Sequence, residues 1–586
     1  MKKNSLLFFS IKYIWKNARV FFVFFLIKTI ITNCKVFVVA YVSKCLFNEI
    51  FKCIQLGLLS VDLIKYIAFS VIIDFTVLIL LRILDFFSEI SVEKYRKDLD
   101  IKNITKCYYL KISVYDDPQK SNELKQFFSD SGSIMNLYCQ FISFICFTCS
   151  FVVSIIIGFK LNVFISLLAI IISLPTFFVK KKNSENEYDL QKKQNGLERL
   201  IAYFKSVLTQ KNYYSEVHIN NNRDFFIDKI NSTVDYKIKE KKSVIKKNTK
   251  RDILIFVFFS FMNLIVNSLI IVCIIYNKLT IGDYTYYSTI IGNLKNSAEQ
   301  LISIVSNLVI SKNKVKNYTK YLYNLKDEIN AGKKGKPDSI EEIEFVHVFF
   351  KYPNSSTFVL NDICLKIKAN EKIAIAGING AGKTTLINLL LRLYQPTSGS
   401  ILINGININD YKIDQYWEIF SCMFQQSLLY NISLRENLLM AINKPNELSD
   451  EYILKKLHLV DFDFDDEDLN KQIGKTFDKD GLIFSNGQSQ KIILERTLFK
   501  ETPILLFDEP SSSMDANSED LIMRLIFENS KNKTLLLISH RLSNLKKMDR
   551  IVFLNNNKIA ELGTHEDLMK NKGKYYELYN MQSSKY

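Results

Sequence analysis

The stretch IAIAGINGAGKTTLINLLLRLY, residues 373–394, places a glycine-rich loop between an apolar strand and a helix. Gly377, Gly382, Lys383 and Thr384 have the spacing of a phosphate-binding loop, or P-loop. Glycines let backbone N–H groups wrap around phosphate oxygens, and the start of the following helix adds the positive end of its dipole. Lys383 is predicted to reach the β- and γ-phosphates, and the Thr384 hydroxyl to bind Mg²⁺. The stretch therefore predicts an ATP site in an α/β domain.

A second apolar strand, ILLFDE at residues 504–509, ends in two carboxylates. Asp508 is predicted to hold Mg²⁺ through water, and Glu509 to orient and deprotonate the attacking water as general base. His540 follows another apolar strand in LLLISHR and is predicted to donate a hydrogen bond to the γ-phosphate. A solvated strand end and a structural histidine are the simpler alternatives. Four apolar residues before the carboxylates argue against the first of these.

A glutamine in FSCMFQQSLLYNISLRENL adds a third polar group to the predicted site. Gln425 is predicted to contact Mg²⁺ and to sense whether the γ-phosphate is present. Gln426 is the alternative in register.

From residue 338 onward, apolar strands alternate with helical stretches. This alternation predicts an α/β domain with a largely parallel sheet over residues 338–586. A polar linker at 321–337, which contains LKDEINAGKKGKP, separates it from the preceding chain. The expected strands are EIEFVHVFF, KIAIAG, SILING, PILLFDE, TLLLIS and RIVFLN.

The first half of the chain has a membrane character. With 586 residues the chain is too long for one domain, and 48% hydrophobic residues is high for a protein surrounded by water. Segments of about 20 apolar residues can cross a hydrocarbon layer of about 30 Å. We expect an all-α, six-helix transmembrane domain over 1–320 with long cytosolic helical extensions. The expected spans are 19–42, 63–87, 135–158, 161–179, 252–276 and 283–309.

The links between these spans predict their orientation. The links after the second and fourth spans are long and rich in lysine, whereas those after the third and fifth are short. Because positive charge marks the cytoplasmic side, both long links and both termini are expected in the cytoplasm. Each long link should contain two helical arms joined by a short crossing helix, near 116–129 and near 208–222. Pro118 breaks the helical pattern of the first link.

Charged residues interrupt the first two spans. Lys28 and Lys35 are seven residues apart and share one helix face, and Asp74 and Arg82 lie in the second span. Charges at membrane depth usually face a bundle interior or a water-filled cavity. They either line a translocation path or pair with one another, and we favour pairing.

The net charge and the cysteines predict neither a nucleic-acid site nor a metal site. A formal net charge of +17 is better explained by a lysine-rich background and positive cytoplasmic loops than by a nucleic-acid partner, and none is expected. The 10 cysteines are scattered. Cys146 and Cys149 lie in an apolar run without a second pair, so buried thiols are expected instead of a zinc site.

The order of motifs in the second half resembles the nucleotide-binding domain of ABC transporters over about 240 residues. An aromatic residue in FFKYP is followed by the P-loop, Gln425, FSNGQ at 484–488, LLFDE, SSMD and His540. Six upstream spans with two long cytosolic links are similar to a type IV exporter half-transporter. The resemblance therefore covers essentially the whole chain. It implies ATP hydrolysis with Mg²⁺ at sites that close only when two half-transporters, here a homodimer, come together.

The resemblance also implies roles for individual residues. Tyr352 would stack on adenine, and Ser485 and Gly487 would bind the γ-phosphate held by the other subunit. Asp515 would lie at the dimer seam, and the crossing helices would dock on the nucleotide domains. The implied nucleotide-binding residues are Tyr352, Gly377, Asn379, Gly380, Ala381, Gly382, Lys383, Thr384, Thr385, Ser485, Asn486, Gly487 and Gln488.

Asn486 is a departure, because the common form of the FSNGQ motif has glycine at this position. Asparagine is among the few residues that tolerate left-handed backbone geometry. Its side chain could instead cap the helix that begins at GQSQKII. Under either hypothesis we expect a site that hydrolyses ATP, because Ser485, Gly487, Gln488 and Glu509 are all present.

The layout of the two long links looks similar to that of bacterial exporters of lantibiotic-type modified peptides. Fewer than about 20 residues precede the first span, so an N-terminal peptidase domain is not expected, and another protein should remove any leader. We expect ATP-driven export across the plasma membrane of a bacterium. A multidrug or lipid exporter is the alternative, and an ATP-gated membrane sensor with little turnover is an alternative of another class.

Overall fold

The computed structural model describes residues 5–276, 279–323, 329, 332–353, 355–442, 448–512 and 514–583. By their mutual contacts these residues form two compact units. The first contains Met1–Lys106 and Glu123–Leu325, and the second contains Cys107–Asn122 and Lys326–Tyr586. The short segment Cys107–Asn122, which the sequence analysis assigned to the transmembrane domain, thus groups with the C-terminal unit.

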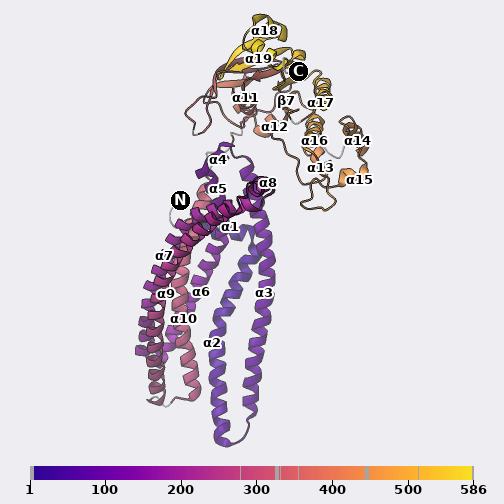
Figure 1. The fold of residues 1–586 in the computed structure, drawn as a ribbon. Coiled ribbons are helices and arrows are strands. Elements are labelled where there is room, and N and C mark those ends of the chain that lie inside the picture. Colours follow the sequence, from indigo (N-terminus) through magenta and orange to yellow (C-terminus); the bar gives the residue numbers. More distant parts are fainter. Residues whose placement is uncertain are drawn as a thin grey trace. The chain divides into compact units, whose positions relative to one another are not determined.

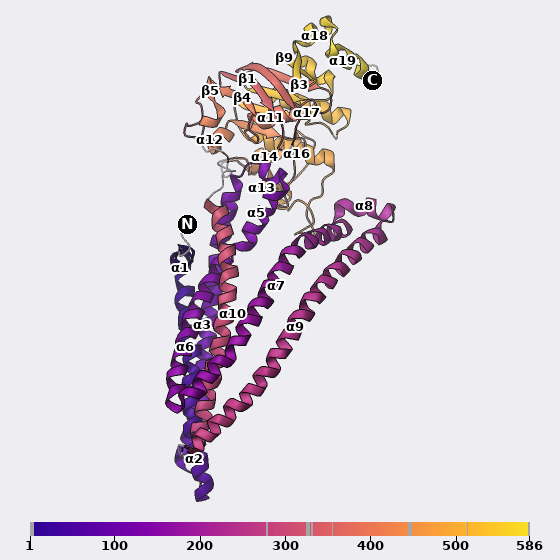
Figure 2. The same ribbon diagram turned by 90° about the vertical axis from the view of Figure 1, so that its left-hand side faces the viewer.

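The first unit is built from long helices (Figures 1 and 2). Helix α2 ends at Gly57, whose left-handed φ of +68° lets the chain turn back into α3. Helices α7 and α9 run side by side to the short α8, and the views of Figures 1 and 2 agree on this pairing. The helices that lie wholly or partly in this unit are α1 (Ser5–Asn17), α2 (Arg19–Leu56), α3 (Val61–Tyr108), α5 (Pro118–Asp130), α6 (Ser133–Leu161), α7 (Val163–Thr209), α8 (Lys211–Ile219), α9 (Arg223–Tyr276) and α10 (Ile281–Tyr323).

Five of the six expected spans fall inside single helices, but the count of six membrane spans is not confirmed. Within the described residues, α2, α3, α6 and α9 are long and apolar enough to cross a membrane. The expected span 161–179 starts at the last residue of α6 and continues after Asn162 in α7, where the apolar stretch found among the described residues is the shorter Val163–Ile172. The expected span 283–309 lies in α10, which is not one of these four helices.

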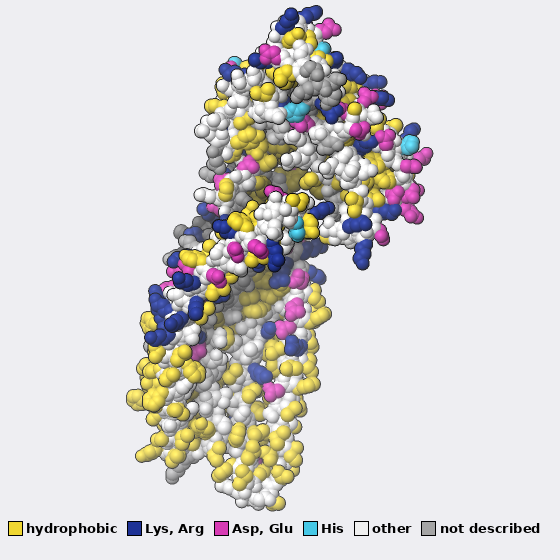
Figure 3. Space-filling model, in the orientation of Figure 1, with side chains coloured by type: hydrophobic (Ala, Val, Ile, Leu, Met, Phe, Trp, Pro, Cys, Tyr) yellow, Lys and Arg dark blue, Asp and Glu magenta, His cyan; other side chains and the backbone are white. Residues whose placement is uncertain are grey.

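Hydrophobic side chains cover much of the first unit. In Figure 3 they dominate the lower part of the helices, while lysine and arginine side chains gather above this band. Exposed large apolar residues of α3, such as Phe69, Phe75 and Leu78, belong to this surface. Such a continuous apolar surface is expected where a helix faces lipid, because hydrocarbon replaces the protein core as the apolar partner.

The charged residues of the first two spans pair with carboxylates of neighbouring helices. Lys35 Nζ lies 2.9 Å from a carboxylate oxygen of Asp74, and Lys28 forms an ion pair with Asp85. Both pairs join α2 to α3. The structure therefore agrees with the pairing hypothesis for Lys35 and Asp74, whereas Lys28 pairs with Asp85, a residue outside the four that the hypothesis named.

The second unit contains two sheets. The antiparallel sheet has the order β2-β1-β4-β5, and the larger sheet has the order β10-β9-β3-β8-β7-β6. All neighbours in the larger sheet are parallel except β10, which runs antiparallel to β9. The strands are β1 (Glu342–Phe350), β2 (Leu360–Lys368), β3 (Lys372–Gly377), β4 (Ser398–Ile403), β5 (Ile406–Asn407), β6 (Phe420–Met423), β7 (Ile504–Asp508), β8 (Thr534–Ile538), β9 (Arg550–Asn555) and β10 (Lys558–Gly563).

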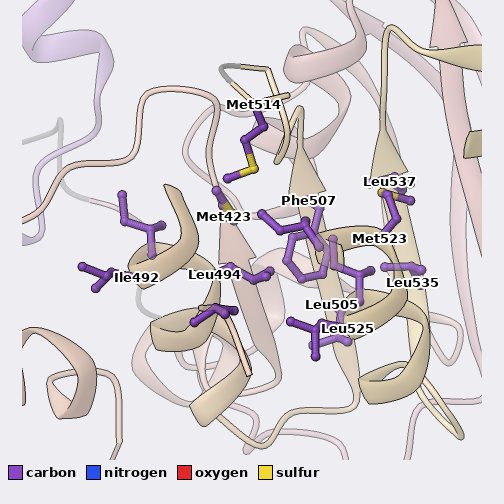
Figure 4. Packing of buried hydrophobic residues seen from close by; sticks show 14 of the residues in the cluster. Met423, Ile492, Leu494, Leu505, Phe507, Met514, Met523, Leu525, Leu535 and Leu537 are labelled. Atoms are coloured by element: carbon purple, nitrogen blue, oxygen red, sulfur yellow. The ribbon is translucent and has the colours of Figure 1, made fainter. Parts of the chain in front are cut away.

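Helices pack on the larger sheet and build its core. In Figure 4, Phe507 of β7 lies among apolar side chains of its neighbouring strands and of two helices. Leu494 comes from α16 (Asn486–Phe499), and Met523 comes from α17 (Ala516–Asn529). The parallel strands are buried on both faces, as all five residues of β7 and of β8 are. This packing brings the ends of β3, β7 and β8 to one edge of the sheet.

The remaining helical elements of this unit are short. They are α4 (Ser113–Asp116), α11 (Lys383–Leu390), η1 (Ile408–Asp410), α12 (Ile413–Trp417), α13 (Leu434–Leu439), α14 (Asp450–His458), α15 (Asp466–Asn470), η3 (Leu542–Lys547), α18 (His565–Asn571) and α19 (Lys574–Ser583).

Candidate functional site

The P-loop connects β3, which lies between β8 and β9, to helix α11. Gly377 and Gly382 have φ values of +151° and +96°, which side chains rarely adopt. A Cβ on Gly377 would lie 2.3 Å from the Leu554 carbonyl oxygen, and one on Gly382 would lie 2.7 Å from Leu360 Cδ2. Both glycines are therefore required by close packing as well as by backbone geometry.

Lys383 lies folded into its own loop. Its Nζ donates to the carbonyl oxygens of Gly377 and Ile378, each at 3.1 Å, and its side chain is buried. Burial lowers the pKa of this lysine, and the nearby Glu509 and Asp508 carboxylates oppose that shift. The ammonium group is thus held by the backbone of the loop. A bound phosphate would have to replace the two carbonyl oxygens as its hydrogen-bond acceptor.

The other predicted residues of the loop divide into exposed and buried positions. Asn379 and Gly380 are exposed, Ala381 and Thr385 are buried, and Thr384 is half-buried. The exposed N–H groups at the turn and the half-buried hydroxyl beside it suit a phosphate that approaches from solvent.

Asp508, the last residue of β7, fits the predicted Mg²⁺ site. Its carboxylate is buried, and neither oxygen accepts a hydrogen bond from a described residue. Burial raises the pKa of Asp508, while the Thr384 hydroxyl, Lys383 and His540 act in the opposite direction. Buried oxygens without a donor are costly, and a hard divalent cation is the partner that carboxylate and hydroxyl oxygens prefer.

Glu509 lies between the two other polar residues that the sequence predicted. His540 Nε2 lies 2.5 Å from Glu509 Oε1, and Gln425 Nε2 donates to Glu509 Oε2 at 3.1 Å. Glu509 has a φ of +54°, an uncommon conformation for a glutamate that often occurs at functional sites. Of the two candidate glutamines, Gln425 is the one that contacts this carboxylate.

Tyr352 lies beside the P-loop helix. Its hydroxyl is 2.9 Å from Thr385 Oγ1, and its ring packs edge-on against Phe350 and Tyr394 with centroids 5.0 and 5.2 Å apart. The ring is half-buried, so one part of it remains available to a flat ligand.

The FSNGQ motif forms the start of α16 and closes its own first turn. The Ser485 side chain accepts from the backbone N–H of Gln488 at 3.2 Å, and the Gln488 side chain accepts from the backbone N–H of Ser485 at 2.9 Å. Such a reciprocal cap satisfies two backbone donors of the helix start. Gly487 follows Asn486 within the first turn of the helix.

Asn486 fits neither of the two hypotheses for its role. It is the first residue of α16, and its φ is not positive, so it carries no left-handed strain. Ser485 already provides the cap of the helix. The Asn486 side chain is exposed at the tip of α16.

The start of α16 is not hydrogen-bonded to the P-loop of the same chain. Among the described residues, no hydrogen bond or ion pair links residues 485–488 to residues 377–385. Asp515 is likewise exposed and caps α17 by accepting from the Ser518 backbone N–H at 3.4 Å.

The segment Cys107–Asn122 contacts the nucleotide domain of its own chain through aromatic and polar groups. The Tyr109 hydroxyl donates to Asp414 at 3.2 Å, and the Tyr394 hydroxyl donates to Asp116 at 2.7 Å. Burial, followed by the contact with Asp116, raises the pKa of Tyr394. Tyr394 also packs on Tyr352, so the segment Cys107–Asn122 lies next to the predicted adenine position.

Sequence reasoning missed the groups that hold the loop after β8. Glu519 forms an ion pair with Arg541 and accepts from Asn544 Nδ2 at 2.7 Å. Gln582 bonds to residues 540 and 542 from the far end of the chain. None of these contacts has a local signal, because each partner lies more than 20 residues away in sequence.

Comparisons with known proteins agree with this geometry. Residues 360–512 match the family described as ABC transporter. The Subtilin transport ATP-binding protein SpaT of Bacillus subtilis is 30% identical over 418 residues, which cover 69% of this chain and 66% of that protein. The ATP-dependent lipid A-core flippase of Wigglesworthia glossinidia brevipalpis is 29% identical over 441 residues, which cover 73% of this chain and 74% of that protein.

Other relatives match over a shorter range. The ATP-dependent lipid A-core flippase of Pseudoalteromonas translucida is 37% identical over 242 residues, 41% of each chain. The chain thus covers less than two thirds of this flippase and of the subtilin transport protein. The fold is also similar to a solved structure described as a bacterial Atm1-family ABC exporter with ATP bound. The superposition covers 95% of this chain and 97% of the exporter chain, with a TM-score of 0.72 and 20% sequence identity. That likeness concerns the fold.

Proposed function

This chain belongs to the ABC transporter family, and on that premise we propose that two copies of it form an ATP-driven exporter. The observation that carries the proposal is the contact of Glu509 with both His540 and Gln425, at the sheet edge where β7 also presents Asp508. A structural role alone does not explain a carboxylate with a left-handed backbone between two polar groups at a solvent-open edge.

In the proposed reaction Glu509 orients a water molecule and accepts its proton as the water oxygen bonds to the γ-phosphorus. The bond from the γ-phosphorus to the β–γ bridging oxygen breaks at the same centre, and ADP and phosphate leave. Lys383 holds the β- and γ-phosphates by moving from its loop carbonyls onto them. His540 contacts Glu509 and donates to the γ-phosphate, which couples the base to its substrate.

Asp508, Thr384 and Gln425 are proposed to hold Mg²⁺. The buried oxygens of Asp508 are the observation that supports this assignment. When bound, the ion neutralises charge on the phosphate oxygens.

A second copy of the chain is proposed to complete each site. The start of α16 is exposed and has no hydrogen-bonded partner in the P-loop of its own chain. It carries backbone N–H groups and a helix dipole that favour an anion. In a homodimer, Ser485, Asn486 and Gly487 of one copy would contact the γ-phosphate held by the other.

We infer that the cargo is a modified, lantibiotic-type peptide. The similarity of the chain to the Subtilin transport ATP-binding protein SpaT supports this class, as does the layout of the two long links in the sequence. The flippase relatives support a lipid cargo as the second candidate, and a multidrug exporter is compatible with the same fold. We place the protein in the plasma membrane of a bacterium, with six spans and both termini in the cytoplasm.

The central test is ATP hydrolysis by the purified protein in lipid nanodiscs. Mg²⁺-dependent turnover is expected, and Glu509→Gln should bind ATP but lose more than about 99% of turnover, because only the base is removed. Parental activity in this variant would show that Glu509 is not the base. Negligible turnover by the unmodified protein would favour the sensor alternative.

The cargo is tested by adding candidate compounds to the same preparation. A leader-bearing or ring-modified peptide should stimulate turnover at concentrations where lipid A-type glycolipids and hydrophobic drugs do not. Stimulation by glycolipid alone would overturn the peptide assignment and leave the exporter function in place.

A further inference from the structure

The last described helix, α19, reaches the loop that carries His540. The Gln582 side-chain Nε2 donates to the His540 carbonyl oxygen at 2.8 Å, and the Gln582 Oε1 accepts from the Leu542 backbone N–H at 3.1 Å. One amide group thus bridges two backbone positions on either side of Arg541. The donor and acceptor needs of these backbone groups also define which way the amide is oriented.

Helix α19 is firmly held where it makes this contact. Tyr575 is fully buried in the core of the larger sheet, and its hydroxyl lies 2.9 Å from His565 Nδ1. The ring of Tyr579 lies under Lys546 of η3, with Nζ 5.3 Å from the ring centroid. The helix that carries Gln582 is therefore a rigid support, and Gln582 transmits its position to the loop after β8.

The bridge joins one buried and one exposed residue: Leu542 is buried and its N–H donates to Gln582, whereas the other end of the bridge lies at His540. His540 is exposed, so water could hydrogen-bond its carbonyl oxygen in the absence of Gln582. The amide instead restricts the direction of the peptide groups from which the imidazole projects. The imidazole in turn touches Glu509, with 2.5 Å between His540 Nε2 and Glu509 Oε1.

We propose that Gln582 is a positioning residue for ATP hydrolysis, which holds His540 at the distance where it reaches both Glu509 and the γ-phosphate. The inference rests on the proposed function and adds the C-terminal helix to the hydrolytic site. Because Gln582 contacts no P-loop residue among the described ones, its loss should change turnover and leave ATP affinity alone.

The test uses the full-length protein in nanodiscs and the substitution Gln582→Ala. The expected result is a kcat roughly tenfold lower with a KM for ATP within about twofold of the parent. Gln582→Glu keeps an acceptor for the Leu542 N–H but has no donor for the His540 carbonyl, so its kcat should fall equally. Ser583→Ala is the matched control, because within the described part of the chain its hydroxyl donates to the Asn580 carbonyl oxygen of the same helix and should be dispensable.

A double-mutant cycle with His540→Ala separates positioning from a general effect on folding. If Gln582 acts through His540, Gln582→Ala should cause no further loss in the His540→Ala background. Additive losses, or a loss that follows a lowered thermal unfolding temperature, would make Gln582 a structural residue. Parental kcat in Gln582→Ala would overturn this inference alone, whereas a parent without ATPase activity would overturn the proposed function with it.

Discussion

Two helix starts in the C-terminal unit are predicted to touch phosphate, and they are built in opposite ways. The start of α11 is enclosed, with glycines 377, 380 and 382 at positive φ and Lys383 buried in its own loop. The start of α16 has right-handed backbone, closes its own first turn and is exposed. The first can surround a phosphate unaided, whereas the second offers only one face. Under the proposed function, this difference assigns nucleotide binding to α11 and the contacts for a second copy to α16.

Lys383→Ala, at the start of α11, and Ser485→Ala, at the start of α16, should impair different steps, ATP binding and ATP turnover respectively. Lys383→Ala removes a charge-assisted phosphate contact and should weaken equilibrium ATP binding by roughly 10- to 100-fold. Ser485→Ala should leave binding within about twofold, as measured with labelled ATP under non-hydrolysing conditions, and lower turnover about tenfold. Equal losses of binding in the two variants would contradict the division between α11 and α16.

Gly377→Ala and Gly380→Ala test how tightly the enclosed start is built. A Cβ at 377 meets the Leu554 carbonyl oxygen at 2.3 Å, whereas one at 380 meets nothing within 4 Å. Both carry backbone strain of about 1–2 kcal/mol, and the clash at 377 adds roughly as much again. Thermal unfolding of the purified variants should show Gly377→Ala to be clearly the less stable. Equal unfolding temperatures would mean that β9 can move away from the loop.

Glu495 lies on the buried side of α16, whereas the start of this helix is exposed. The side chain is 2% exposed, and burial raises its pKa from 4.5 to about 7, with Lys456 opposing. Because the folded-state pKa is raised, this group favours folding below about pH 4.5 and loses that contribution as pH rises through 7. At 1.36 kcal/mol per pH unit, the ionised carboxylate costs up to about 3 kcal/mol at pH 8.

Glu495→Gln should therefore be more stable than the parent at pH 8 and equally stable near pH 4.5. Thermal unfolding at a series of pH values measures this directly, and the exposed Glu501→Gln serves as the control. An unchanged pH dependence in Glu495→Gln would show that this carboxyl group is solvated, and that the back of α16 is as open as its tip.

Asn486→Gly should have the smallest effect. Since the backbone of Asn486 is not left-handed, glycine relieves no strain and costs helix α16 at most about 1 kcal/mol. Turnover should stay within about threefold of the parent. A loss of turnover above tenfold would show that the exposed Asn486 side chain contacts nucleotide or the partner subunit. Asn486 would then join Ser485 in the surface that α16 is proposed to offer to the second copy.

The sequence by itself determined the features whose physics is local. The P-loop could be predicted because its glycines, lysine and threonine lie within eight consecutive residues and act through their own backbone turn. Six strands were predicted within two residues of their observed bounds, β1, β3, β4, β7, β8 and β9. Strands β2, β5, β6 and β10 were not predicted. Strands β5 and β6 are short, with two and four residues, and give little periodic signal. The alternation of apolar and polar residues in β2 and β10 is a strand signal that the prediction did not use.

Only the tertiary structure decided which distant groups meet. Gln425 contacts Glu509 because β6 and β7 pair in parallel with Met423 opposite Phe507, and His540 reaches the same carboxylate because Asp508 lies opposite Ile538. Strand register is set by packing over the whole sheet, and no single segment encodes it. The same is true of Gln582, which lies 42 residues beyond His540.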